Sequence, residues 1–458
     1  MKVIVCGAGQ VGFSIARYLA QEDNDVVVVD HSTELTRKIS DRLDVKAITG
    51  FASEPAVLEQ AGAADADLII AVTQADEVNM VACQIAHSLF DITTKIARIR
   101  KQGYLDPKWG NLYTRDNMPI DVIISPEREV AKAVSSRLRV PGAFETISLV
   151  DDKVKLVGVR CEEDCPVLNT PLRQLTQLFP ELNVVIVGIV RDNENIIPSG
   201  EDQLVAGDGV YLALDSKHVQ RVMSVFGHDE TEARRIVIFG GGNIGLFLAQ
   251  KVEEEHSTVN IKVVEEDKTK AESAARNLKR SVVLQGDILD PEIMDEANVD
   301  AAEAVIAVTN DDETNILASL LAKRAGSRRA ITLVNNSAFE PIIPSLGIDV
   351  LINPRNITVS TILQHVRRGR IHSVHTLQEG FGELIEAEAM QTSSLVGVPL
   401  KEADLPEGVL VGAIVRNDEV IVPRGSTTVN VHDRVVLFAA TEAVKQVEQM
   451  FSVGLEFF

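Results

Sequence analysis

The sequence has few of the features that place a chain in a membrane or on nucleic acid. Its 458 residues carry 45 Lys and Arg against 67 Asp and Glu, a net charge of −22. A phosphate backbone needs a positive protein face, so nucleic acid is not an expected partner. No apolar run approaches the roughly 18 residues that a membrane-spanning helix needs. Because Met1-Lys2-Val3 enters a predicted strand directly, we expect a cytoplasmic protein that reaches a membrane only through a partner.

Cysteine and clustered histidine are also scarce. The four cysteines form no C-x-x-C pair, and no second half or well-placed His accompanies Cys161-Glu-Glu-Asp-Cys165 to make a metal site. His372 and His375 lie on an extended segment, where residues three apart face opposite sides. The sequence therefore predicts ordinary reduced cysteines, no disulfide and no metal site.

One glycine-rich motif occurs twice. An apolar strand, a G-x-G-x-x-G turn and an amphipathic helix run from Val3 to Leu19 and again from Ile236 to Val252. In this context the first Gly permits a tight turn, the second admits a pyrophosphate, and the third lets helix and strand pack closely. The helix N-terminus offers N–H groups to the anion. The candidate nucleotide-binding residues of the two turns are Gly7, Gly9, Gln10, Val11 and Gly12, and Gly240, Gly242, Asn243, Ile244 and Gly245.

An acidic residue ends the next predicted strand of each copy. Asp30 follows the apolar run Val26–Val29, and Glu265 holds the same place in the second copy. A carboxylate here suits the ribose hydroxyls of an adenosine and repels a 2′-phosphate, which favours NAD(H) over NADP. The alternative is that Asp30 is only a helix N-cap.

Thr73 and Thr309 close further predicted strands at the carboxyl edge of the sheet, where doubly wound folds bind ligands. In the first copy Arg98 and Arg100 lie at alternate positions of the next predicted strand, so both side chains are on one face of it. They form either a solvated surface or a pair of phosphate ligands. In the second copy Val334 takes the place of Arg98, so we expect a ligand rich in phosphate charge, such as ATP, to prefer the first site.

The repeat extends over the whole chain. Matching segments recur about 230 residues apart, although the first half has about eight extra residues around Trp109. The predicted fold class is α/β, with two doubly wound Rossmann-like parallel-sheet domains alternating with two small α+β domains. The expected domains are residues 1–141, 142–228, 232–370 and 371–458. The apolar faces of Val130–Leu138 and Val359–Val366 are expected either at an intersubunit surface or inside the fold.

The chain lacks the residues of an obvious reaction. Neither α+β segment offers a clear general acid or base to a nicotinamide, and no G-x-S-x-G elbow or G-x-x-x-x-G-K-[ST] loop occurs. Two adenine-nucleotide sites without a reaction predict a sensor and no enzymatic activity.

The glycine turns, Asp30 and the repeated Ala-Val-Thr plus Asp-Glu-x-Asn blocks closely resemble the TrkA family, the regulatory subunits of bacterial Trk potassium uptake systems, over essentially the whole chain. The resemblance implies two tandem RCK (KTN) units, binding of NAD(H) and of ATP or ADP, and a homotetrameric ring. It also implies docking on a membrane-embedded potassium transporter subunit at the inner face of the cell inner membrane. The nucleotide site would then use Asp30, Thr73 and Arg98 in the first half, and Glu265 and Thr309 in the second.

Two alternatives stay open at this point. One is an NAD-dependent oxidoreductase, which would turn over NADH with a substrate. The other is a gating subunit of a different cation transporter or channel, which would copurify with a different membrane protein.

Overall fold

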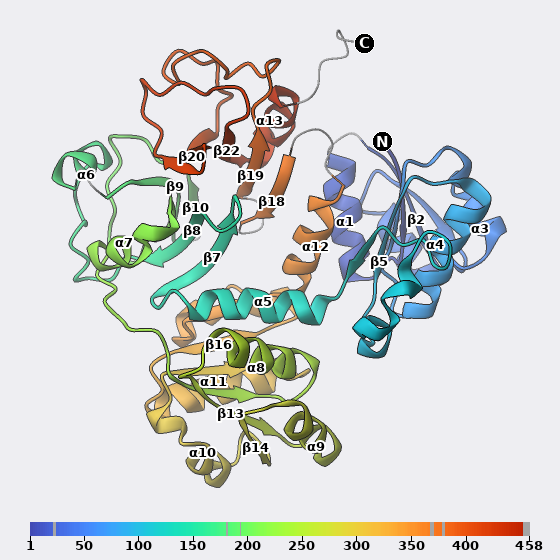
Figure 1. Cartoon of the computed structure of the whole chain (residues 1–458), viewed down its shortest axis with the longest axis horizontal. Helices are drawn as coiled ribbons and strands as arrows, with labels where there is room; N and C mark the ends of the chain where they lie inside the picture. The colour runs from blue at the N-terminus through green and yellow to red at the C-terminus, as the bar shows by residue number, and fades with distance from the viewer. Residues whose placement is uncertain (22–23, 180–181, 193, 367–370, 378–380, 452–458) are drawn as a thin grey trace. The chain divides into compact units, whose positions relative to one another are not determined.

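A computed structural model describes residues 1–21, 24–179, 182–192, 194–366, 371–377 and 381–451 (Figure 1). The chain divides into two compact units. The first comprises Met1–Glu129 and Pro354–Val366, and the second comprises Val130–Asn353 and Arg367–Phe458. No helix within the described ranges is long and apolar enough to cross a membrane.

The first unit is built on a six-stranded parallel sheet. Its order is β3-β2-β1-β4-β5-β6, the doubly wound arrangement of dinucleotide-binding folds. The central strands of the sheet are almost fully buried because their continuous apolar runs face helices on both sides. Their bounds are β1 (Lys2–Cys6), β2 (Asp25–Asp30), β3 (Lys46–Thr49), β4 (Leu68–Ala71), β5 (Thr94–Arg98) and β6 (Val122–Ile124).

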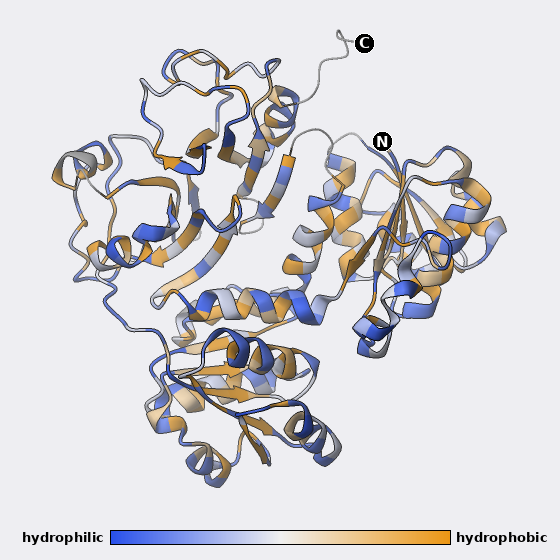
Figure 2. Cartoon of the chain, viewed as in Figure 1, coloured by the Kyte–Doolittle hydropathy of each residue, from blue (hydrophilic) through white to orange (hydrophobic). Residues whose placement is uncertain are grey.

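The helices of this unit are α1 (Gln10–Gln21), α2 (Thr33–Ser40), α3 (Pro55–Gln60) and α4 (Asp76–Phe90). Figure 2 shows strongly apolar strands flanked by helices of mixed character, as expected for helices with one buried face. The extra residues of the first half form two short 3₁₀ helices, Gln102–Leu105 and Pro107–Tyr113.

A helix from the second half completes the first core. α12 (Pro354–Gln364) packs against α1 and β6. Its side chains Val359, Ile362 and Leu363 are buried among apolar residues of the first sheet and of α1. The apolar face of Val359–Val366 therefore lies inside the fold of a single chain.

The second unit contains another parallel sheet of the same order, β14-β13-β12-β15-β16-β17. Its strands are β12 (Arg235–Phe239), β13 (Asn260–Glu265), β14 (Val282–Gln285), β15 (Ala304–Ala307), β16 (Ala330–Leu333) and β17 (Val350–Ile352). Its helices are α8 (Asn243–Glu255), α9 (Lys268–Asn277), α10 (Pro291–Ala297) and α11 (Asp312–Ala325).

The C-terminal part of α5 (Pro126–Leu138), a helix of the first half, packs within this second unit. Ser135 Oγ donates to Glu255 of α8 at 2.9 Å. The guanidinium of Arg329 donates to the carbonyl of Arg137 at 3.0 Å and to that of Ala143. Since the last carbonyls of a helix lack partners within the helix, Arg329 caps α5 from the neighbouring domain.

Two antiparallel sheets complete the second unit. Their orders are β10-β9-β11-β8-β7 and β18-β19-β22-β20-β21. They share one apolar core that includes Tyr211, Phe381 and Phe438. The strands are β7 (Ala143–Leu149), β8 (Val154–Arg160), β9 (Val184–Arg191), β10 (Glu194–Ile196) and β11 (Gly209–Asp215), then β18 (Ile371–Thr376), β19 (Gly382–Glu388), β20 (Val409–Arg416), β21 (Glu419–Ile421) and β22 (Arg434–Ala440).

Short helices accompany these sheets. They are α6 (Leu172–Leu178) and α7 (Val219–Val225) in the first half, and α13 (Val444–Met450) in the second. The predicted fold class is confirmed. The four domain boundaries remain a prediction, and those at residues 370 and 458 lie outside the described residues.

The exchanged position of α12 gives a test by hydrogen exchange. We expect Ile362→Ala to destabilise the first Rossmann-like domain by about 2–5 kcal/mol and to speed exchange in α1 but not in α8. The control is Ile306→Ala, a buried residue of β15, which should affect α8 and spare α1. Faster exchange in α8 alone after Ile362→Ala would contradict this packing.

Candidate functional site

The first glycine turn connects β1 to α1 at the carboxyl edge of the sheet. Gly7 has a φ of +113°, which L side chains rarely adopt, and its N–H donates to the Val29 carbonyl at 2.7 Å. A Cβ on Gly12 would lie 1.8 Å from the carbonyl oxygen of Gly7. No side chain fits there, so this glycine sets the close approach of α1 to β1.

Gly9 differs from Gly7 and Gly12 in the free space around it. No described atom lies within 4 Å of the position that its Cβ would occupy. The backbone is therefore open at the point where a phosphate would approach the start of α1. Gln10 begins that helix with an exposed side chain, and Val11 is half-buried.

The second turn has the same geometry. Gly240 has a φ of +105°, and a Cβ on Gly245 would lie 1.9 Å from its carbonyl oxygen. The position above Gly242 is free of described atoms within 4 Å. Asn243 begins α8 with an exposed side chain, and Ile244 is half-buried.

The predicted acidic residues hold these turns. Asp30 is buried and accepts from the backbone N–H of Ala8 at 2.7 Å and from that of Ser32 at 2.8 Å. Glu265 accepts from Gly241 N–H, also at 2.7 Å, and from Asp267 N–H at 3.1 Å. Asp30 is not the cap of the following helix, since that position belongs to Ser32.

Thr73 and Thr309 lie at the same edge, beside the first glycine of each turn. A Cβ on Gly7 would be 3.0 Å from the Thr73 nitrogen. Thr73 donates from both its N–H and its hydroxyl to Asn79 Oδ1, at 2.9 and 2.7 Å. Thr309 makes the same two bonds to Asn315. Each threonine is therefore fixed by an asparagine of the following helix.

The Asp-Glu-x-Asn block is a brace that the sequence alone did not identify. Buried Asp76 accepts from the N–H groups of Arg100 and Lys101, the latter at 2.8 Å. These bonds hold the loop that follows β5. Glu77 is exposed and bonds Lys101 Nζ at 2.6 Å, and this hydrogen bond lowers the pKa of Glu77 to about 2.

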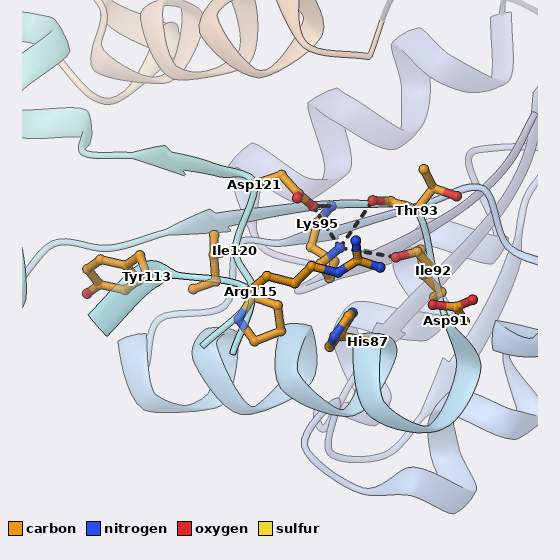
Figure 3. A pocket seen from close by; sticks show the side chains of 10 residues that line it. His87, Asp91, Ile92, Thr93, Lys95, Tyr113, Arg115, Ile120 and Asp121 are labelled. Carbon is orange, nitrogen blue, oxygen red and sulfur yellow. Dashed lines mark hydrogen bonds and ion pairs between the residues drawn. The ribbon is translucent and has the colours of Figure 1, made fainter. Parts of the chain in front are cut away.

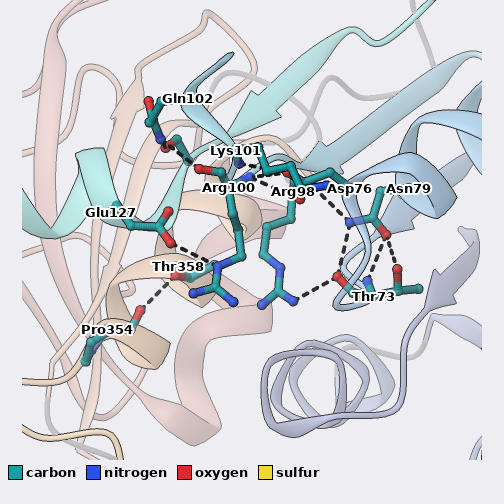
Figure 4. A network of polar contacts seen from close by, with 11 residues as sticks. Thr73, Asp76, Asn79, Arg98, Arg100, Lys101, Gln102, Glu127, Pro354 and Thr358 are labelled. Carbon is teal, nitrogen blue, oxygen red and sulfur yellow. Dashed lines mark hydrogen bonds and ion pairs between the residues drawn. The ribbon is translucent and has the colours of Figure 1, made fainter. Parts of the chain in front are cut away.

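Arg98 and Arg100 lie side by side at this edge (Figure 4). Arg98 donates to the Thr73 carbonyl at 2.8 Å, while no described residue accepts from its buried Nε. Burial, and next the charge of Arg100, lower the pKa of Arg98. Arg100 Nε bonds Glu127 Oε1 at 2.9 Å. Two guanidinium groups thus lie at this edge, with the carboxylates of Glu127 and Asp76 nearby. The buried Nε of Arg98 leaves a donor for an anion.

The second half lacks these cations. Leu333 is the structural counterpart of Arg98, since Asn79 donates to the Arg98 carbonyl and Asn315 to the Leu333 carbonyl, and Leu333 is buried and apolar. Asn335 stands in place of Arg100. The sequence placed Val334 opposite Arg98, but its N–H donates to Ile352 as that of Ile99 does to Ile124, so Val334 matches Ile99. The brace itself is retained, because Asp312 accepts from the N–H groups of Asn335 and Asn336. The two sheet edges have the same backbone scaffold and different charge.

Two further features of the first edge gave no signal in the sequence. His31 and Phe51 stack with ring centroids 5.4 Å apart, next to Asp30, where the second half has Glu266 and Asp287. Arg355, the second residue of α12, donates to Gln10 Oε1 at 3.0 Å. A residue of the second half thus contacts the first glycine turn, which no local pattern could predict.

A polar pocket of about 340 Å³ lies at the opposite, amino-terminal edge of the first sheet (Figure 3). At its base Lys95 Nζ bonds Asp121 at 2.8 Å and the carbonyls of Ile92 and Thr93 at 3.1 Å. The side chain of Arg115, from the extra residues of the first half, extends across it. In the second half Lys323 of α11 bonds the equivalent Asp349 at 3.0 Å. Lys95 therefore has a structural role, far from the glycine turn in the sheet.

The fold and the two glycine turns define a class: a chain of two Rossmann-like units, each followed by a small antiparallel domain. Family models agree with this alternation, since the TrkA-N domain matches residues 3–126 and 236–354 and the TrkA-C domain matches 156–227 and 384–452. The chain belongs to the TrkA family of Trk system potassium uptake proteins.

The relatives cover the full chain. The Trk system potassium uptake protein TrkA of Azorhizobium caulinodans is 53% identical over 458 residues, 100% of both chains. The protein of the same name from Halomonas elongata is 40% identical over 462 residues, again 100% of both chains. The predicted family is confirmed, as is the prediction of a potassium transport protein that is not an enzyme.

Solved structures share the fold. The RCK domain of GsuK superposes with a TM-score of 0.59 at 18% identity, covering 98% of this chain and 94% of that one. A structure described as the GsuK channel bound to NAD has a TM-score of 0.60 at 19% identity, covering 98% of this chain and 78% of that one. At this identity the likeness concerns the fold alone.

The glycine geometry predicts that two Gly→Ala substitutions within one motif differ in their effect on stability. Gly12→Ala should lower the unfolding temperature, because overpacking typically costs about 1–3 kcal/mol and the new methyl meets backbone. Gly9→Ala should leave the unfolding temperature of the ligand-free protein nearly unchanged, since its methyl enters open space. Equal melting temperatures for the two variants in differential scanning calorimetry would refute this.

Proposed function

We propose that the chain is a nucleotide-sensing regulatory subunit that gates a membrane potassium uptake transporter. Each parallel sheet would bind the adenosine and phosphates of NAD(H), and of ATP or ADP, at its carboxyl edge. The observation that carries the proposal is the pair of glycine turns, each open above the central glycine and each bonded to a buried carboxylate.

The side chains and backbone groups at each sheet edge are of the types that bind ribose hydroxyls and phosphates. One carboxylate oxygen of Asp30 or Glu265 holds the turn, and a carboxylate has further lone pairs for ribose hydroxyls. Thr73 and Thr309 line the same edge. The first α-helical N–H groups, behind Gly9 and Gly242, are suited to phosphate.

The path from ligand to transporter would begin at α12. Arg355 contacts Gln10 in the first turn and follows β17 of the second sheet after two intervening residues. A phosphate that competes for Gln10 or Arg355 would alter this contact and so bias the position of α12. A ligand acts in this way only through unequal affinity for two shapes, and coupling of about 1–3 kcal/mol is usual.

Exposed apolar side chains support self-assembly, which we propose yields a tetrameric ring. On α4, Val81 is 41% and Leu89 is 61% exposed. On α11, Leu317 is 50% and Leu321 is 38% exposed, and Leu317 is the repeat counterpart of Val81. An exposed apolar side chain thus recurs at one equivalent position of the two helices, which favours an interaction surface there. The ring would dock on the transporter subunit at the inner face of the cell inner membrane.

Titration calorimetry with NADH tests the two sites separately. We expect two classes of sites in the wild-type chain and the loss of one class in each of Asp30→Ala and Glu265→Ala. Loss of a hydrogen bond to a charged group costs about 1.5–3 kcal/mol, so affinity at the altered site should fall roughly tenfold to a hundredfold.

The control variants are Asp30→Asn and Glu265→Gln, which keep an acceptor for the turn but lose the charge. Circular dichroism should show that all four variants fold. If NADH and ATP do not bind, or if they bind and leave potassium flux through the reconstituted transporter unchanged, the proposed function is wrong.

The charge difference between the edges predicts that ATP prefers the first site. Arg100→Asn, which installs the residue of the second half, should weaken ATP binding there by about tenfold, with Glu127→Gln added so that no unpaired carboxylate remains. NADH binding should change less, because its pyrophosphate carries less charge. Equal ATP occupancy of both sites in a bound structure would contradict this prediction.

A further inference from the structure

Cys161 and Cys165 meet in a turn that follows β8 in the first antiparallel domain. The backbone of Cys161 pairs with a neighbouring loop, since its N–H donates to Asp208 at 2.8 Å and its carbonyl accepts from Gly207 at 2.7 Å. The N–H of Cys165 donates to the Glu162 carbonyl at 3.1 Å, which closes a tight turn. The two cysteines therefore flank one turn of fixed backbone.

Both side chains are buried in the same apolar core and both are free thiols. They belong to one turn and lie next to each other in that core. Their interaction lowers the pKa of Cys165 and raises the pKa of Cys161. One sulfur is thus the better thiolate and the other is a proton donor in contact with it.

The second half shows that this turn does not require sulfur. Ala389 and Ser393 occupy the two positions. Ala389 N–H donates to Asp433 at 2.8 Å, its carbonyl accepts from His432 at 2.7 Å, and Ser393 N–H donates to Met390 at 2.9 Å. These are the backbone bonds of the first turn, residue for residue. Packing alone is satisfied by Ala and Ser, so two cysteines in contact call for a chemical explanation.

The other two cysteines provide an internal comparison. Cys6 lies in β1 and Cys83 in α4, both fully buried. Burial raises the pKa of Cys6, and burial likewise raises the pKa of Cys83 to about 12. A thiol that stays protonated reacts slowly with oxidants.

We propose that Cys161 and Cys165 form a reversible disulfide when the protein meets a peroxide. The Cys165 thiolate attacks one peroxide oxygen, the O–O bond breaks, and the departing hydroxide takes a proton to become water. The Cys161 sulfur then attacks the sulfenic acid of Cys165, forms the S–S bond, and its proton leaves with the hydroxide as a second water. Two thiols are oxidised and one peroxide is reduced, and a dithiol reverses the reaction.

The bond would form close to where the first antiparallel domain ends. A Cβ on Gly227 would lie 3.6 Å from the Cα of Cys165, and the His228 ring bonds the Arg160 carbonyl at 3.0 Å. Because Cys161 and Cys165 are buried, the peroxide gains access through local opening of the turn. Oxidation would therefore be slower than at a surface thiol but faster than at Cys6 or Cys83.

Mass spectrometry tests this on the full chain. Trypsin cleaves after Arg160 and Arg173 and places both cysteines in one peptide. After hydrogen peroxide and alkylation of remaining thiols, we expect this peptide to appear without alkyl groups and lighter by two hydrogen atoms. Dithiothreitol should restore it, and Cys6 and Cys83 should oxidise at least about tenfold more slowly.

Substitutions that install the residues of the second half distinguish an effect on thiol oxidation from an effect on folding. Cys161→Ala should leave Cys165 as a sulfenic acid that dimedone traps, and Cys165→Ser should abolish oxidation at the turn. The double variant, with Ala and Ser as at positions 389 and 393, should fold with an unchanged melting temperature and circular dichroism spectrum. The proposal is overturned if both wild-type thiols remain alkylatable, or if oxidation proceeds to sulfinic acid without an S–S bond.

Discussion

Each half of this chain depends on one hydrogen bond between a strand end and a glycine turn. The carboxylate that ends the second strand accepts the N–H of the residue after the first glycine, at 2.7 Å in both halves. This bond fixes a turn whose backbone no other residue type would adopt at Gly7 or Gly240. That turn positions the start of the following helix and the open space above the central glycine. It also places the neighbouring threonine beside the first glycine.

The sheet edges of the two halves share one backbone scaffold and differ in charge. Asp76 and Asp312 brace their loops through backbone N–H groups, so the side chains that follow are free to differ. The first half has Arg98 and Arg100 at this edge, and the second has Leu333 and Asn335. The two copies in this way keep one backbone geometry and present different charge at their sheet edges.

Much of the fold could be predicted from local sequence. The apolar runs, the G-x-G-x-x-G turns and Asp30 follow short-range rules, and their predicted positions agree with the strands and turns observed. The strand order within the antiparallel sheets could not be read from the sequence, because the strands of such sheets are specified by their neighbours. Thr73 lies where the sequence placed it, but its partner Asn79 emerged only from the packing of α4 on the sheet.

The sequence by itself determined the duplication, the doubly wound parallel class of the two larger domains and the residue types available at each sheet edge, because these follow from periodicity and residue type. Only the tertiary structure decided that α12 completes the core of the other half and that Arg355 reaches Gln10. It also brought Cys161 and Cys165 into contact across a turn. The contacts of α12 and of Arg355 join residues far apart in the sequence, whose proximity depends on how whole elements pack, and no spacing along the chain records that.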